Sequence, residues 1–64
     1  MNVELTIKNK DGAIICDHER YELEELKHHP AFSADERNQM DVFYVGIDAT
    51  TIFRGDSQFI LSRV

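Results

Sequence analysis

The feature that most constrains the fold is a near-continuous apolar run, Asp41-Val42-Phe43-Tyr44-Val45-Gly46-Ile47. Apolar side chains occupy both side-chain parities of this run, which is rich in β-branched and aromatic residues. A strand with one face in solvent alternates between apolar and polar residues, whereas a strand covered on both faces is apolar throughout. We therefore predict that residues 41–47 form the central strand of a sheet.

The chain has 64 residues, which is enough for a single small domain, residues 1–64. A domain of this size buries only about 60% of the surface that its unfolded chain exposes, and small domains usually add disulfides, a metal or a second subunit. Cys16 is the only cysteine, which excludes an intrachain disulfide and fits a reducing compartment. No apolar run approaches the ~20 residues of a membrane helix. We therefore expect a cytoplasmic protein that makes no membrane contact.

An N-terminal hairpin is predicted from an alternating apolar pattern that is followed by a turn signal and a second apolar run. Val3, Leu5 and Ile7 alternate with polar residues, which is typical of a half-buried strand. A turn signal at residues 9–12 ends in a glycine, which tolerates a positive φ. Residues 13–16 then return as a second strand, which we expect to extend as far as residue 19 or 20.

Two further strands are predicted at the C-terminus, over residues 50–54 and 58–63, with Gly55-Asp56 as the turn between them. The alternative is a short helix over residues 49–54 that begins at an Asp48 cap and ends at Gly55. Two adjacent threonines followed by isoleucine and phenylalanine favour the strand.

Two short helices are predicted between the hairpins. Good helix formers fill residues 22–29, and Pro30 ends that helix. Ser33 and Glu36 have the spacing of a capping box, which predicts a second helix over residues 34–39.

These elements give an α+β fold in the order β-β-α-(α)-β-β-β. A small antiparallel sheet, made of the N-terminal hairpin and the C-terminal strands, carries one or two short helices on one face. Side chains on the inward parity of the strands and the apolar side of the helix form the predicted core, namely Val3, Leu5, Ile7, Ile14, Leu26, Phe43, Val45, Phe59 and Leu61.

The net charge of −5 lies entirely in the middle of the chain. Residues 1–16 and 42–64 each balance two acids against two bases, whereas residues 17–41 hold eight acids and three bases. Nucleic-acid binding requires Lys and Arg for the phosphates, so direct nucleic-acid binding is disfavoured. A solvated face is the ordinary explanation of such a charge run, and a surface that engages a basic partner is the functional one.

We therefore expect a non-catalytic binding or regulatory module that engages a protein partner with a basic surface. Such a module acts as an inhibitor or as a nucleic-acid mimic. The carboxylates that we expect to contact the partner are Glu19, Glu22, Glu25, Asp35 and Glu36.

Metal and enzyme chemistry are not supported by the residue spacing. Cys16, His18, His28 and His29 are ligand types, but the two adjacent histidines point to different sides of a helix. The serines lie in no nucleophile elbow, the three glycines form no phosphate loop, and so small a core leaves little room for a substrate pocket. We expect no enzyme activity, no metal and no cofactor.

Arg54-Gly55-Asp56-Ser57 matches an adhesion motif. A tight turn between two strands explains these residues without a receptor.

Self-association is the alternative function. A strand over residues 58–63 carries little charge beyond Arg63, and monomers usually protect an exposed edge strand with charge or proline. The sequence therefore also predicts a structural or accessory protein that is completed as a homodimer through this strand.

Overall fold

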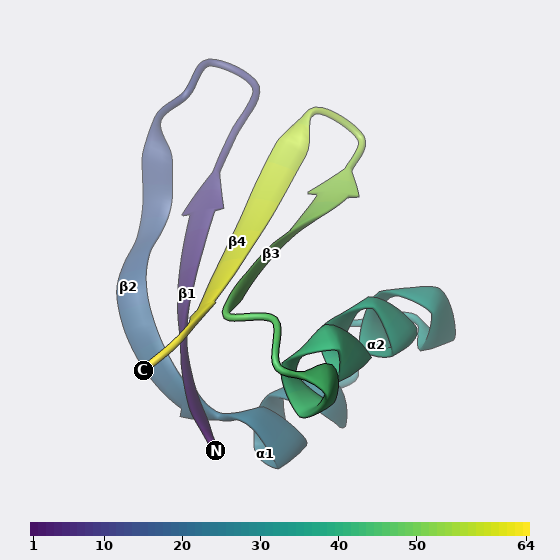
Figure 1. Cartoon of the computed structure of the whole chain (residues 1–64). Coiled ribbons are helices and arrows are strands. Elements are labelled where there is room, and N and C mark those ends of the chain that lie inside the picture. Colours follow the sequence, from purple (N-terminus) through teal and green to yellow (C-terminus); the bar gives the residue numbers. More distant parts are fainter.

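A computed structural model describes residues 1–64 as a four-stranded antiparallel sheet with short helices against it (Figure 1). The elements are β1 (Asn2–Lys8), β2 (Ile14–Glu22), α1 (Leu23–Lys27), α2 (Ala34–Met40), the 3-10 helix η1 (Asp41–Val45), β3 (Ala49–Arg54) and β4 (Ser57–Arg63). The strand order β2-β1-β4-β3 places the first and last strands side by side in the middle of the sheet. The predicted α+β fold class is confirmed.

The strand register divides the side chains between two faces of the sheet. Leu61 lies opposite Leu5, and Ile52 lies opposite Phe59. Directly opposed residues of an antiparallel pair share a face. The inner face, which the helices cover, carries Val3, Leu5, Ile7, Tyr21, Ile52, Phe59 and Leu61. The outer face carries the alternate residues, including Glu4, Thr6, Thr51, Phe53 and Ile60.

The core is one apolar layer between the inner face and the helical segments. Nine apolar side chains are buried in it: Val3, Leu5, Leu23, Leu26, Phe32, Met40, Phe43, Ile52 and Leu61. Helix α1 has five residues, too few to be stable alone, so its two buried leucines fix it to the sheet. In Figure 1 the helices cover one end of the sheet, and both hairpin turns lie at the other end.

The predicted central strand over residues 41–47 is wrong. Asp41–Val45 is a 3-10 helix that continues α2, and Gly46 ends it in the left-handed conformation with φ of 93°. Three residues make one 3-10 turn, so Phe43 faces the core while Val45 is 76% exposed. The helix that begins at the Ser33 cap and ends at Gly46 outweighs the β propensity of this run, because tertiary context overrides strand propensity.

The other predictions from the sequence have mixed outcomes. Residues 50–54 lie within strand β3 and residues 58–63 within β4, so the alternative helix at residues 49–54 is excluded. Ile14, predicted to be buried, is 51% exposed near the start of the edge strand β2. Strand β4, predicted to expose an edge, lies between β1 and β3. The N-terminal strand covers it, and the open edges belong to β2 and β3.

Substitution of Phe43 and Val45 separates the helical structure of this segment from the strand predicted for it. Phe43→Ala removes a side chain that is 1% exposed and is expected to lower the free energy of unfolding by about 3–5 kcal/mol. Val45→Ala removes a solvent-exposed side chain and is expected to change that free energy by less than about 0.5 kcal/mol. Urea denaturation of both variants measures the difference. Equal losses would show that both side chains are buried, as a central strand requires.

Candidate functional site

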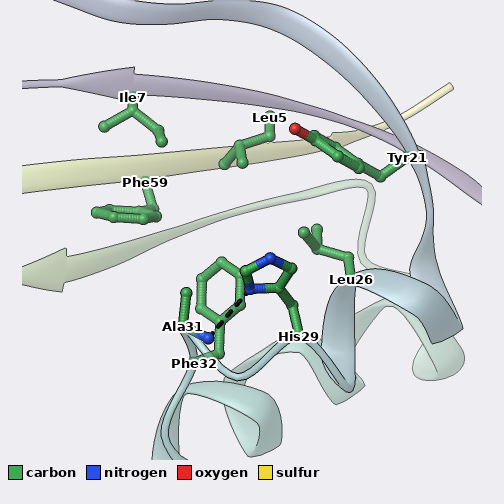
Figure 2. A pocket seen from close by; sticks show the side chains of 8 residues that line it. All are labelled: Leu5, Ile7, Tyr21, Leu26, His29, Ala31, Phe32 and Phe59. Atoms are coloured by element: carbon green, nitrogen blue, oxygen red, sulfur yellow. Dashed lines mark hydrogen bonds between the residues drawn. The ribbon is translucent and has the colours of Figure 1, made fainter.

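An apolar groove opens between the inner face of the sheet and the connection from α1 to α2 (Figure 2). Its volume is about 170 Å³. It is lined by eight residues, of which all but His29 are hydrophobic: Leu5, Ile7, Tyr21, Leu26, His29, Ala31, Phe32 and Phe59. Five of the eight come from the acidic segment 17–41, which therefore supplies most of the groove wall.

The turn around Pro30 positions the helical side of the groove. Helix α1 ends at the His28 cap, since a proline disfavours helical conformation in the residue before it. The Phe32 amide donates to the His29 carbonyl at 3.1 Å. The Phe32 ring then packs edge-on against Phe59 of β4, with ring centroids 5.8 Å apart. This turn leaves Ala31 at the groove with only a methyl group, so the space in front of the sheet stays open.

His29 supplies a polar atom at the groove. Its Nδ1 accepts a hydrogen bond from the Ala31 amide at 3.0 Å, drawn as a dashed line in Figure 2. An Nδ1 that accepts leaves the proton on Nε2. In Figure 2 this second nitrogen points away from the turn, toward the strands. The His29 ring therefore presents an N–H donor to the apolar space.

Glu19 lies at the β2 side of the groove through its contact with Tyr21. The Tyr21 hydroxyl donates to Glu19 Oε2 at 2.7 Å. This hydrogen bond to a carboxylate raises the pKa of Tyr21 above its ordinary value. The rim of the groove at this point therefore carries an exposed negative charge.

An ion pair supports the opposite wall. Arg54 of β3 lies over the rings of Phe59 and Phe32, at 4.5 and 5.5 Å from their centroids. Its Nη2 and Nε donate to the two carboxylate oxygens of Glu36 at 2.7 and 2.9 Å. Glu36 Oε1 also accepts from the Ser33 amide at 2.9 Å, and the Ser33 hydroxyl accepts from the Glu36 amide, so the predicted capping box is confirmed. Hydrogen bonding to Arg54 lowers the pKa of Glu36 to about 2.

The five carboxylates predicted to contact a partner have different environments. Glu36 forms an ion pair with Arg54. Glu22 caps α1 by accepting from the amides of Glu24 and Glu25. The N-terminal ammonium also donates to Glu22 at 2.9 Å, and this bond lowers the pKa of its carboxyl. Glu25 and Asp35 are exposed on α1 and α2 and have no side-chain bond. Of the five, only Glu19 bonds to a residue that lines the groove, namely Tyr21, and Glu36 supports the wall through Arg54.

The candidate metal ligands are not brought together. No group of three or more His, Cys, Asp or Glu side chains lies close enough to hold a metal ion. His18 pairs with Asp17 at 2.5 Å, and His28 lies 3.6 Å from Glu24. The Cys16 thiol donates to the Leu5 carbonyl at 3.6 Å, and burial raises its pKa, which disfavours the reactive thiolate.

A second surface that the sequence did not predict surrounds η1. Tyr44, Val45 and Ile47 are exposed large apolar side chains. The Tyr44 hydroxyl donates to Glu24, which raises the pKa of Tyr44 to about 12. Lys27 lies 4.9 Å from the Tyr44 ring centroid. Exposed apolar side chains that lie together mark candidate interaction surfaces, but no cavity is formed there.

The ion pair that supports the groove makes stability depend on pH. The pKa of Glu36 in the folded chain is below its value in the unfolded chain, so the pair stabilises above about pH 4.5 and loses this contribution as the pH falls toward 2. Glu36→Gln is expected to lower the free energy of unfolding by about 1–2 kcal/mol at pH 7. Urea denaturation across this pH range should show that the difference in the free energy of unfolding between wild type and Glu36→Gln shrinks as the pH falls toward 2.

Asp35→Asn is the matched control, because Asp35 is in the same helical turn and is exposed. We expect it to change stability little at any pH. A Glu36→Gln difference that stays constant from pH 7 to pH 2 would contradict the assigned ion pair.

Comparisons of the chain with protein-family models, curated proteins and solved structures find no match. No helix has the length and apolar character needed to cross a membrane.

Proposed function

We propose that the protein is a non-catalytic binding module of the cytoplasm that holds a segment of a protein partner in the apolar groove. An apolar side chain of the partner enters the groove, and a basic residue beside it pairs with Glu19. The observation that carries this proposal is the groove itself, an open apolar cavity beside an exposed carboxylate.

The size of the groove favours one side chain over a free ligand. A volume of about 170 Å³ is close to the ~150 Å³ apolar cavity that holds one benzene ring. Small-molecule sites usually measure about 300–1,000 Å³. Protein interfaces, in contrast, often depend on a single anchor side chain held in a well-packed pocket. A leucine, methionine or phenylalanine side chain fits this space.

The charge around the groove favours a basic partner. The three bases of segment 17–41 all have contacts within the chain: Arg20 with Glu4, Lys27 with Asp41, and Arg37 with the Phe32 carbonyl. Glu25 and Asp35 remain without a base. An unbalanced negative surface speeds encounter with a positive one and repels nucleic acid. The module therefore binds a basic protein surface, as an inhibitor or as a mimic of nucleic acid. It does not bind nucleic acid itself.

Filling the groove tests the proposal directly. Ala31→Leu replaces the methyl group at the groove with an isobutyl group. It keeps the backbone amide of residue 31, which donates to His29 Nδ1. Ala34→Leu is the matched control, because Ala34 is an exposed alanine on α2 that does not line the groove. The partner is first captured from the native host with the wild-type protein, and its affinity for each variant is then measured by titration.

We expect Ala31→Leu to weaken binding at least about 10-fold, because it removes one well-packed anchor contact. We expect Ala34→Leu to bind the partner as the wild type does. Glu19→Gln is expected to slow association and to flatten its salt dependence. Equal affinity of the two leucine variants, with both folded by circular dichroism, would overturn the proposal.

A further inference from the structure

Strand β3 is the unprotected edge of the sheet. The other edge, β2, has register shifts against β1, a positive φ of 50° at His18 and a series of charged residues. Bulges and charges are the features that keep edge strands from pairing with other chains. Strand β3 pairs without a register shift, contains no proline and has one charged residue, Arg54, at its end. Its free side is therefore open to another strand.

The hydrogen bonding of β4 identifies the backbone groups that point outward from β3. The Arg63 amide donates to the Asp48 carbonyl at 2.7 Å, so these two residues form a hydrogen-bonded pair of the antiparallel ladder. Such pairs alternate with non-bonded pairs along the strand. The N–H and C=O groups of Ala49, Thr51 and Phe53 therefore point away from β4, toward solvent.

We propose that a second copy of this chain pairs with β3 around a two-fold axis at Thr51. In this antiparallel register, Thr51 lies opposite Thr51 of the second copy, and Ala49 lies opposite Phe53 of the second copy. All three residues with outward-pointing backbone groups then exchange hydrogen bonds with the second copy. The two sheets become one continuous sheet with both helical layers on the same face.

The side chains of β3 complement themselves in this register. On the outer face, Phe53, which is 69% exposed, lies beside the small side chain of Ala49 from the second copy. At the ends of the paired strands, Asp48, whose side chain is 81% exposed, lies opposite Arg54 of the second copy. Arg54 keeps its bonds to Glu36 of its own chain, so this position brings no like charges together and adds no new ion pair. Shifting the register by two residues separates Phe53 from Ala49 and leaves one outward-pointing residue unpaired.

This interface differs from the groove in position and chemistry. It uses the backbone of β3 and its outer-face side chains, whereas the groove lies on the inner face. It also differs from the homodimer predicted from the sequence, which placed the exposed edge on residues 58–63. Those residues lie inside the sheet, so the open edge of β3 takes that role.

Proline at position 51 blocks the edge selectively. The Thr51 amide points outward, so Thr51→Pro removes a donor that β4 does not use, and prolines are tolerated at such edge positions. Sedimentation over the micromolar to millimolar range is expected to give twice the 7.4 kDa chain mass for the wild type and a single chain mass for Thr51→Pro.

Cysteine cross-linking tests the register, also if the proline variant fails to fold. In a Cys16→Ser background, Thr51→Cys places two thiols in a hydrogen-bonded pair with Cα atoms about 5.5 Å apart, within the ~4.4–6.8 Å range of disulfides. Phe53→Cys is the control, because its two copies lie about 13 Å apart along the strands. We expect a disulfide dimer from Thr51→Cys and none from Phe53→Cys.

Three results would overturn the proposal. They are a wild-type monomer at all concentrations, a Thr51→Pro dimer as stable as the wild type, and cross-linking of Phe53→Cys in place of Thr51→Cys. A monomeric wild type would leave β3 open to a strand from a different protein.

Discussion

The pairing of β1 with β4 is the constraint on which the rest of the fold depends. It joins the two ends of the chain, with Leu5 opposite Leu61, and it merges two hairpins that are each marginal alone. Once merged, the hairpins form an apolar inner face wide enough to require a cover. The segment from α1 to Gly46 supplies that cover as it crosses from the edge strand β2 to the edge strand β3. The core, the groove and the open edge all follow from this strand order.

The cover is made of helices too short to be stable alone, and carboxylates tie them to distant parts of the chain. Glu22 begins α1 and binds the N-terminal ammonium. Glu36 closes the cap of α2 and binds Arg54 of β3. These two carboxylates act within the fold. The excess negative charge of segment 17–41 therefore divides into a structural part and a part that remains on the surface, and Glu19 belongs to the second.

Local patterns predicted the fold class, and contacts between distant residues explain the failures. The alternation in β1 and the spacing of Ser33 and Glu36 each determine a local structure, and both were predicted. The composition of residues 41–47 reports β propensity and does not reveal that the helix predicted over residues 34–39 continues into this run. The groove was also not predictable, because its lining residues have the sequence pattern of core residues. The space arises from the turn at Pro30, which leaves only the methyl group of Ala31 at the groove.

The backbones of the two central strands, β1 and β4, are expected to make close contacts. The Val64 amide donates to the Asn2 carbonyl, so alternation along the ladder makes Leu5 and Leu61 a non-bonded pair with Cα atoms about 4.5 Å apart. Nuclear magnetic resonance should therefore show a strong Overhauser contact between the Hα atoms of Leu5 and Leu61. The absence of this contact, together with Hα contacts between residues 42–47 and any strand, would contradict the sheet order and the account built on it.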